Sequence, residues 1–342
     1  MVERIQIVVA GVPRSYQQPF PDGRWLTDAH SDQISGVSSR VDLWHTSRAA
    51  LAAGERPEPG AEVLLIEASG DEPYLDEIPT EEFARLVTPR LRWVQTCSSG
   101  VGHVLELGLL PQNVTITNAA GVHADALAES VMAAVLLHAK RIPERIERQA
   151  RHEWAELHCS ELGGRTICII GTGHIGSAVA RLASAFRMRV VGVRRNLLPT
   201  EYVDEVVSPT HLHRALGEAD YIVIACPLTV ETEGMLGSGE FTATKRGAYL
   251  INISRGKVVQ EPALLAALAD GTLSGAFLDA HAHEPLPPDH PFWTAPNVIV
   301  IPHDSHSSPH LGDNIVDLFA DNLRRYVHGE PLRNVIDRER GY

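Results

Sequence analysis

The stretch that decides the fold is TICIIGTGHIG, residues 166–176. Its first five residues form an apolar, β-branched run typical of a buried strand, and a GxGxxG pattern follows directly, just before a helical pattern. In such a loop the first glycine allows a tight turn, the second leaves space for a pyrophosphate, and the third lets helix and strand pack closely. The alternative is a glycine-rich turn without a ligand. The residues predicted to bind a dinucleotide here are Gly171, Gly173, His174, Ile175 and Gly176.

Outward from this stretch, short β-branched runs alternate with helical patterns along the chain, which is typical of βαβ units. Six runs predict a complete doubly wound sheet: Thr166–Ile170, Arg189–Val193, Tyr221–Ala225, Tyr249–Ile253, Gly275–Leu278 and Val298–Ile301. Five runs in the first third predict a smaller one: Ile5–Ala10, Val41–His45, Val63–Glu67, Trp93–Cys97 and Val114–Asn118. The predicted fold class is α/β, with a flavodoxin-like domain, a Rossmann domain and a cleft between them.

Two helical patterns bear on the domain organisation. One predicts a single long helix from His123 through Arg141 towards Arg151, and the other a terminal helix from His310 to His328 that packs back on the first domain. We expect residues 1–117 and 306–342 to form one domain and residues 118–305 the other. Residues 11–25, with three prolines and no periodicity, indicate a surface loop to which we assign no role.

The composition is that of a globular protein. Its 342 residues, 44% of them apolar, suffice for about two domains at roughly 150 residues each. The chain has 30 Lys and Arg and 43 Asp and Glu, which gives a net charge of −13. Nucleic acid and anionic membranes, which are themselves negatively charged, are therefore poor partners. No apolar run approaches the ~18 residues that a membrane-spanning helix needs. Without CxxC spacing we expect free thiols and a cytoplasmic location, the cysteines being Cys97, Cys159, Cys168 and Cys226.

The end of the second strand indicates which dinucleotide binds. A fold that prefers NAD usually has a carboxylate there, for the adenosine ribose. Here the strand Arg189–Val193 ends in Arg194 and Arg195, and a planar guanidinium suits a 2′-phosphate. We therefore predict that NADP(H) is preferred and that NAD(H) remains possible. The alternative is that both arginines simply form a solvated strand end.

Three polar segments follow later strands: NISRG at 252–256, DAHAHEP at 279–285 and IPH at 301–303. Open α/β sheets bind their ligands at these carboxyl ends. A guanidinium, a carboxylate and an imidazole are what the reduction of a 2-oxo acid needs, as anchor, orienting group and proton donor. The candidates for these roles are Arg255, Glu284 and His303. Each also has a structural alternative: a buried salt bridge, a turn cap or a structural histidine.

With these segments in place, the chain resembles the D-isomer-specific 2-hydroxyacid dehydrogenase family over nearly its whole length. The matching stretches are Ser98–His103, Asn118–Val122, Ala128–Glu129, Gly171–Gly176, Pro227–Thr229 with Thr232, Asn252–Gly256 with Ala263–Leu264, Asp279–Pro285 and Pro302–His303. The arginine-rich end of the second strand looks most like the glyoxylate and hydroxypyruvate reductases. The resemblance implies an NADP(H)-dependent reductase that converts a small 2-oxo acid to the D-2-hydroxy acid, in a cleft that closes on cofactor and substrate.

The resemblance also implies roles for individual residues. Arg255 would bind the substrate carboxylate and carbonyl oxygen, and His303 would be the general acid and base. Glu284 would hydrogen-bond His303 and stabilise its charged form. The other implied site residues are Asp279 at the nicotinamide carboxamide, the Ser99-Gly100 backbone at the substrate carboxylate, and Pro227, Ile253 and Ser254 along the cofactor cleft. The helix from His123 resembles the family's dimerisation arm, so we expect a homodimer.

Departures from the family pattern leave the substrate open. Gly102 stands where the family often has Asp, and His281 stands where the family usually has an aromatic residue. Asp304 stands where the family has a small apolar residue, and its carboxylate could act on His303 or point away from it. Histidines crowd residues 281–310, and we expect them at the surface, without a metal.

The alternatives are a dinucleotide-sensing, corepressor-like interaction protein, a sugar-acid reductase, or another family member that uses NAD. Glu284 argues against a formate dehydrogenase, which typically has glutamine there, and nothing singles out phosphite.

Overall fold

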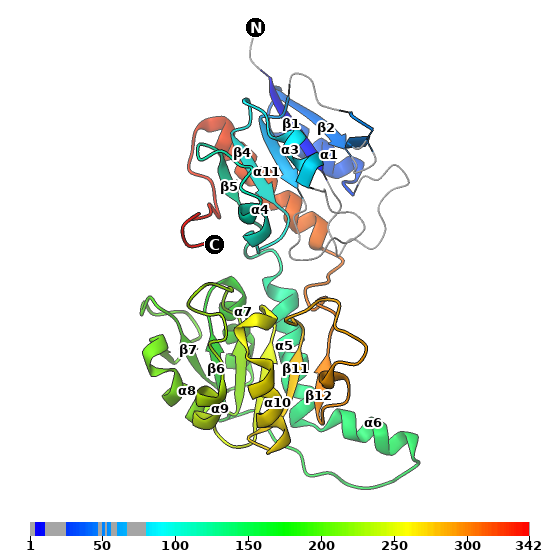
Figure 1. Ribbon diagram of the computed structural model, residues 1–342, viewed down its shortest axis with the longest axis vertical. Helices are drawn as coiled ribbons and strands as arrows, with labels where there is room; N and C mark the ends of the chain where they lie inside the picture. The colour runs from blue at the N-terminus through cyan, green and yellow to red at the C-terminus, as the bar shows by residue number, and fades with distance from the viewer. Residues whose placement is uncertain are drawn as a thin grey trace. The chain divides into compact units, whose positions relative to one another are not determined.

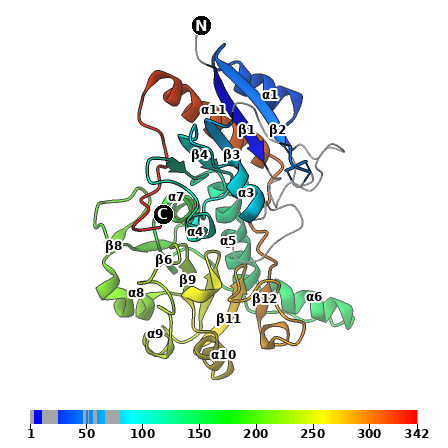
Figure 2. The ribbon, with the colours of Figure 1, turned by 45° about the horizontal axis from the view of Figure 1, so that its top comes forward.

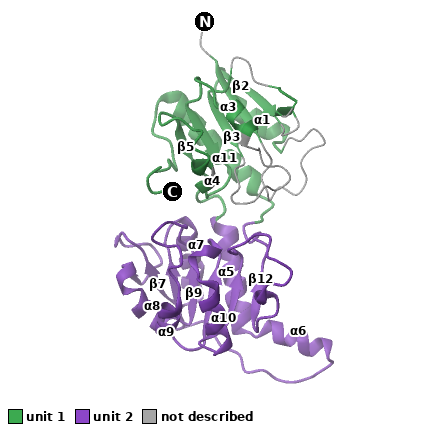
Figure 3. Cartoon of the chain, in the orientation of Figure 1, with its two compact units in different colours: residues 1–123, 307–342 green, residues 124–306 purple. Residues whose placement is uncertain are grey.

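The structure, a computed structural model, describes residues 4–10, 25–46, 50–51, 53–55, 60–66 and 80–341 (Figure 1). The chain forms two compact units (Figure 3). Unit 1 comprises residues 1–123 and 307–342, and unit 2 residues 124–306. The sequence-based boundaries were placed after residues 117 and 305. The predicted α/β fold class is confirmed, since each unit is built on a parallel sheet covered by helices.

The sheet of unit 2 has seven strands in the order β12-β11-β10-β9-β6-β7-β8, all paired in parallel. They are β6 (Thr166–Ile170), β7 (Arg189–Val193), β8 (Glu205–Val207), β9 (Tyr221–Ile224), β10 (Ala248–Asn252), β11 (Leu273–Leu278) and β12 (Val298–Val300). The prediction of six strands missed β8. This edge strand follows Asp204 and contains only two apolar residues in a row, Val206 and Val207, so the sequence shows no apolar run there.

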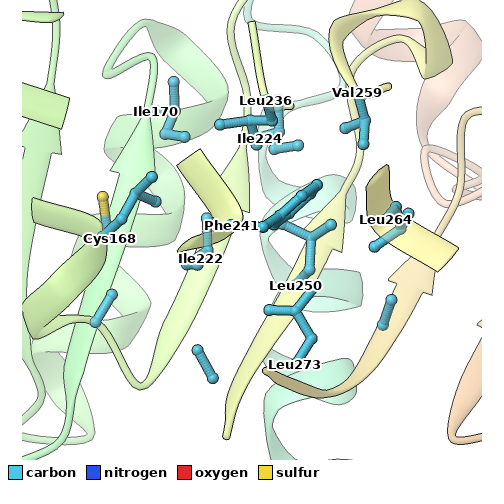
Figure 4. Close-up of a cluster of buried hydrophobic side chains, with 14 of the residues drawn as sticks. Cys168, Ile170, Ile222, Ile224, Leu236, Phe241, Leu250, Val259, Leu264 and Leu273 are labelled. Atoms are coloured by element: carbon cyan, nitrogen blue, oxygen red, sulfur yellow. The ribbon is translucent and has the colours of Figure 1, made fainter. Parts of the chain in front are cut away.

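Helices cover both faces of this sheet (Figures 1 and 2). On one face, Phe241 of α9 and Leu264 of α10 pack with Leu250 of β10 in one hydrophobic core (Figure 4). On the other, α5 and α7 pack against the alternate strand residues, such as Ile167 and Ile169. The helices are α5 (Ala124–Ala139), α6 (Ile142–Ala150), α7 (His174–Ala185), α8 (Leu212–Glu218), α9 (Ser238–Ala243) and α10 (Glu261–Ala269), with 3₁₀ turns at Pro209–His211, Gly256–Val258 and Pro291–Trp293.

The single long helix predicted from His123 to Arg151 is wrong, because the structure has two helices there. Helix α5 ends at Ala139, Arg141 adopts a left-handed conformation with φ 52°, and α6 starts with Pro143 in its first turn. A proline lacks the N–H that a continuous helix would need, and its ring opposes the preceding turn. Figure 1 shows α6 projecting from the body of unit 2.

Unit 1 contains a five-stranded parallel sheet in the order β2-β1-β3-β4-β5 among its described residues. Its elements are β1 (Ile5–Ala10), α1 (Asp28–Ser35), β2 (Val41–Thr46), β3 (Val63–Ile66), α3 (Thr80–Leu86), β4 (Trp93–Thr96), α4 (Gly102–Glu106), β5 (Thr115–Thr117) and α11 (Leu311–His328). The five predicted strands are confirmed. The predicted 11–25 loop lies, apart from Trp25, outside the described residues.

The C-terminal helix α11 packs on unit 1, as predicted. Leu311, Ile315 and Leu323 are buried against the sheet. Phe319 is fully buried, and its ring stacks on that of Trp93 with 5.1 Å between centroids. Within the described part of the chain, we find no helix with the length and apolar character that would let it cross a bilayer.

Candidate active site

The glycine loop joins β6 to α7 at the carboxyl edge of the unit 2 sheet. A Cβ on Gly176 would lie 2.0 Å from the carbonyl oxygen of Gly171, so only glycine allows this close approach. A Cβ on Gly173 would meet no atom of the described chain within 4 Å. Open space therefore adjoins Gly173 at the first turn of α7, where helix N–H groups such as those of His174 and Ile175 lack intrahelical acceptors. The loop fits a pyrophosphate.

Two arginines follow β7, next to this loop. The Gly171 N–H donates to the Val193 carbonyl over 2.9 Å, so Arg194 starts beside the first glycine. Arg194 donates to the Thr200 hydroxyl over 2.9 Å, and Arg195 lies 3.9 Å from the Glu231 carboxylate. The Arg195 and Glu231 side chains are 57% and 70% exposed, so their attraction is weak.

A polar contact at this edge joins the predicted acid, His303, to its predicted partner, Glu284. Glu284 follows β11 and His303 follows β12, which are neighbouring strands. Nδ1 of His303 lies 2.8 Å from Oε2 and 3.1 Å from Oε1 of Glu284. A carboxylate on Nδ1 fixes the hydrogen there and leaves Nε2 as the ring nitrogen that can exchange a proton with a ligand. His303 is also held at φ 55°, an uncommon backbone conformation for a non-glycine residue.

Arg255 follows β10, in a turn held by Asn252. The Asn252 side chain accepts from the N–H and hydroxyl of Ser254, each over 3.1 Å, and donates to the Arg255 carbonyl over 3.1 Å. A Cβ on Gly256 would lie 2.0 Å from the carbonyl carbon of His281, so the two main chains touch. This contact places the Arg255 turn against the segment that leads to Glu284.

Asp279 is completely buried at the end of β11. Its Oδ1 accepts from the Ser305 N–H over 3.1 Å, and its Oδ2 has no hydrogen-bond partner in the described chain. Burial raises the pKa of Asp279, while a positive charge on His303 acts in the opposite direction. The Ser130 hydroxyl of α5 donates to the Ser305 carbonyl over 2.9 Å. Sequence reasoning missed this hydrogen bond to the segment after His303, because 175 positions separate the two serines.

The family is decided by comparison with known proteins. Residues 132–305 match the model of the NAD-binding domain of D-isomer-specific 2-hydroxyacid dehydrogenases. A glyoxylate reductase from Korarchaeum cryptofilum is 34% identical over 77% of this chain and 81% of its own length. The chain belongs to the D-isomer-specific 2-hydroxyacid dehydrogenase family. It is therefore an oxidoreductase with a site for a nicotinamide cofactor.

Two further relatives of this dehydrogenase are informative. The glyoxylate/hydroxypyruvate reductase B of Yersinia pestis is 34% identical over 75% of this chain and 80% of its own. The crystal structure of an NADPH-dependent glyoxylate/hydroxypyruvate reductase from Sinorhizobium meliloti, in complex with NADP and sulfate, superposes with a TM-score of 0.81 at 27% identity. That alignment covers 99% of this chain and all of the other.

The remaining predicted residues of the dehydrogenase lie in both units. Pro227 follows β9, while Ile253 and Ser254, both buried, follow β10. Ser99 and Gly100 lie in unit 1 after β4, where the Asn118 side chain donates to the Ser99 carbonyl over 2.7 Å. Their roles, and the contact of Asp279 with a carboxamide, stay predictions.

The expectation that the crowded histidines are surface residues is wrong for His281. Its exposed fraction is only 7%. His283 and Asp304 are exposed, so Asp304 points into solvent. The rings of His303 and His306 lie edge to face at 6.4 Å. Among the described residues, no three His, Cys, Asp or Glu side chains gather as metal ligands would.

Proposed function

We propose that this dehydrogenase uses NADP(H) to reduce a small 2-oxo acid of the glyoxylate or hydroxypyruvate type to the D-2-hydroxy acid. The observation that carries the proposal is the hydrogen bond of 2.8 Å between Glu284 and Nδ1 of His303 at the carboxyl edge of the cofactor sheet. The names of the reductases from Korarchaeum and Yersinia support the substrate class.

The residues act as follows in this mechanism. NADPH, when bound, supplies the hydride. The Arg255 guanidinium binds the substrate carboxylate and polarises the carbonyl group. His303 gives the proton on Nε2 to the carbonyl oxygen, which becomes the hydroxyl, and the remaining imidazole is neutral. The carboxylate of Glu284 stabilises the positive charge that His303 carries before this transfer. In the reverse direction His303 takes the proton back.

The preference for NADP(H) rests on the end of β7. Arg194 and Arg195 directly follow β7, at the position where this fold usually has a carboxylate when it binds NAD. The relative from Sinorhizobium meliloti was crystallised with NADP. In this chain the positive charges of Arg194 and Arg195 would attract the 2′-phosphate of NADP(H).

We also propose a homodimer that uses α5 and α6. None of the residues of α6 is buried, and Ile146 on it is 61% exposed. Trp154, just beyond α6, is fully exposed. A second copy of the chain would cover these apolar side chains. Analytical ultracentrifugation tests this, since Ile146→Asp with Trp154→Ala should turn the dimer into a monomer.

The proposed reaction is tested by following the oxidation of NADPH and NADH side by side with glyoxylate, hydroxypyruvate, pyruvate, phenylpyruvate and 2-ketogluconate. The proposal predicts turnover of a small 2-oxo acid and a higher kcat/KM with NADPH. Cofactor binding without turnover of any of these acids would contradict it and favour a dinucleotide-sensing protein.

A further inference from the structure

His281 forms one hydrogen bond to the side chain of Glu284 and another to the main chain that leads to His303. Its backbone N–H donates to Oε1 of Glu284 over 2.9 Å. Its ring Nε2 lies 3.0 Å from the carbonyl oxygen of Ile301, two residues before His303. One residue therefore connects the turn after β11 to the segment that follows β12.

The geometry fixes the tautomer of His281. A carbonyl oxygen only accepts, so Nε2 must carry the hydrogen in this contact. In a neutral ring Nδ1 is then the acceptor nitrogen, and it is buried without a hydrogen-bond partner within the described chain. The ring thus makes a single side-chain hydrogen bond, and that bond is directed at the strand end that carries His303.

The surroundings leave His281 little freedom. Its main chain is in contact with Gly256, where a Cβ would lie 2.0 Å from the His281 carbonyl carbon. Its ring lies near that of Phe292, with 6.5 Å between centroids and 48° between the ring planes. A phenylalanine at position 281 could fill the same space, but it would have no N–H for the Ile301 carbonyl.

We propose that His281 is a positioning residue that holds Glu284 and His303 at their hydrogen-bonding distance, through its backbone N–H on one side and its ring N–H on the other. This inference rests on the proposed function for its catalytic consequence. Loss of the ring N–H frees the 301–303 segment from the turn before Glu284, so the imidazole is presented to the substrate less accurately. The effect is on orientation, because the ring hydrogen of His281 is engaged with the Ile301 carbonyl.

The test compares His281→Phe, which keeps a ring and removes the donor, with His281→Gln, whose side-chain N–H₂ can reach the same carbonyl. The matched control is His138→Phe. His138 is a partly buried histidine of unit 2, and its Nε2 contacts the Ser274 hydroxyl at 3.0 Å, close to the amino ends of the strands. We expect His281→Phe to lower kcat/KM on the order of tenfold, since a displacement of about 1 Å can cost roughly a hundredfold. His281→Gln should recover most of this loss, and His138→Phe should show none of it.

A second readout does not depend on turnover. Long-range ¹H–¹⁵N spectra of histidine-labelled protein should show the Nε2–H tautomer for His281 in the wild type. They should also show displaced His303 resonances in His281→Phe, and wild-type positions in the control. Unchanged His303 resonances in His281→Phe, or equal losses in the Phe and Gln variants, would overturn the proposal. If the wild-type protein reduces none of the 2-oxo acids, the proposed function fails while the spectra still decide the positioning role.

Discussion

Replacement of Glu284 by glutamine tests the contact on which the proposed mechanism depends. In the wild type both carboxylate oxygens lie within 3.1 Å of Nδ1 of His303, and Oε1 also accepts from the His281 N–H. The side chains of Glu284 and His303 are only 21% and 22% exposed, so water screens the pair incompletely. Glutamine keeps one acceptor oxygen, loses the negative charge and turns an N–H₂ group towards either Nδ1–H or the His281 N–H.

The size of the effect follows from this geometry. A hydrogen bond to a charged group contributes about 1.5–3 kcal/mol and a neutral one about 0.5–1.5 kcal/mol. The lost charge alone therefore costs about 1–2 kcal/mol, which is roughly a 5- to 30-fold loss in rate. The misplaced N–H₂ group adds to this loss. We expect the kcat/KM for 2-oxo acid reduction by Glu284→Gln to fall at least about tenfold.

The assay is NADPH oxidation with the preferred 2-oxo acid over a pH series, together with the Kd of NADPH. Glu240→Gln is the matched control, because Glu240 likewise accepts from a histidine, His213, over 3.1 Å and from a backbone N–H, that of Gly237, over 3.0 Å. Glu240 lies on α9, away from the candidate site, and its variant should keep wild-type kinetics. A Glu284→Gln enzyme within twofold of wild type at every pH would refute the reasoning.

Three further predictions concern cofactor choice and stability. Arg194→Ala with Arg195→Ala should raise the Kd of NADPH more than about tenfold and that of NADH much less, because only NADPH carries the 2′-phosphate; equal losses in a fluorescence titration would remove the phosphate argument. Burial lowers the pKa of His138 below its ordinary 6.5. As the pH falls, this histidine is therefore protonated at a higher pH in the unfolded chain than in the folded protein. The free energy of unfolding should decrease as the pH falls below about 6.5. Urea titrations of wild type and His138→Phe should differ in this slope, and identical slopes would exclude His138 as its origin. Phe319→Ala removes a fully buried ring stacked on Trp93 and should lower the free energy of unfolding by about 3–5 kcal/mol; a loss below about 1 kcal/mol in denaturant titrations would mean that α11 is not anchored there.

Most of the fold could be predicted from the sequence because buried parallel strands are short, apolar and β-branched, so each appears as a separate run. The two misses have local causes. Strand β8 contains only two consecutive apolar residues, Val206 and Val207, and gains its strand structure by pairing with β7, which its own sequence does not reveal. The predicted long helix ignored Pro143, whose effect on the chain outweighs the helical spacing on either side.

The candidate site could be predicted in part for a topological reason. Arg255, Glu284 and His303 each follow a strand, and the carboxyl ends of parallel strands meet at one edge of the sheet. His281 and Ser130 could not be assigned their contacts in this way. Their partners are the main-chain carbonyl groups of Ile301 and Ser305. Every residue has such a carbonyl group, so the residue type at the acceptor position does not reveal the contact.

The central claim is that His303 transfers the proton in an NADPH-dependent reduction of a small 2-oxo acid. The most direct measurement is kcat for NADPH oxidation by the wild type and by His303→Ala, with glyoxylate and with hydroxypyruvate, alongside the Kd of NADPH for both proteins. We expect turnover by the wild type, a loss on the order of a hundredfold or more in His303→Ala, and similar cofactor affinity for the two proteins. A His303→Ala enzyme that keeps wild-type turnover would contradict it.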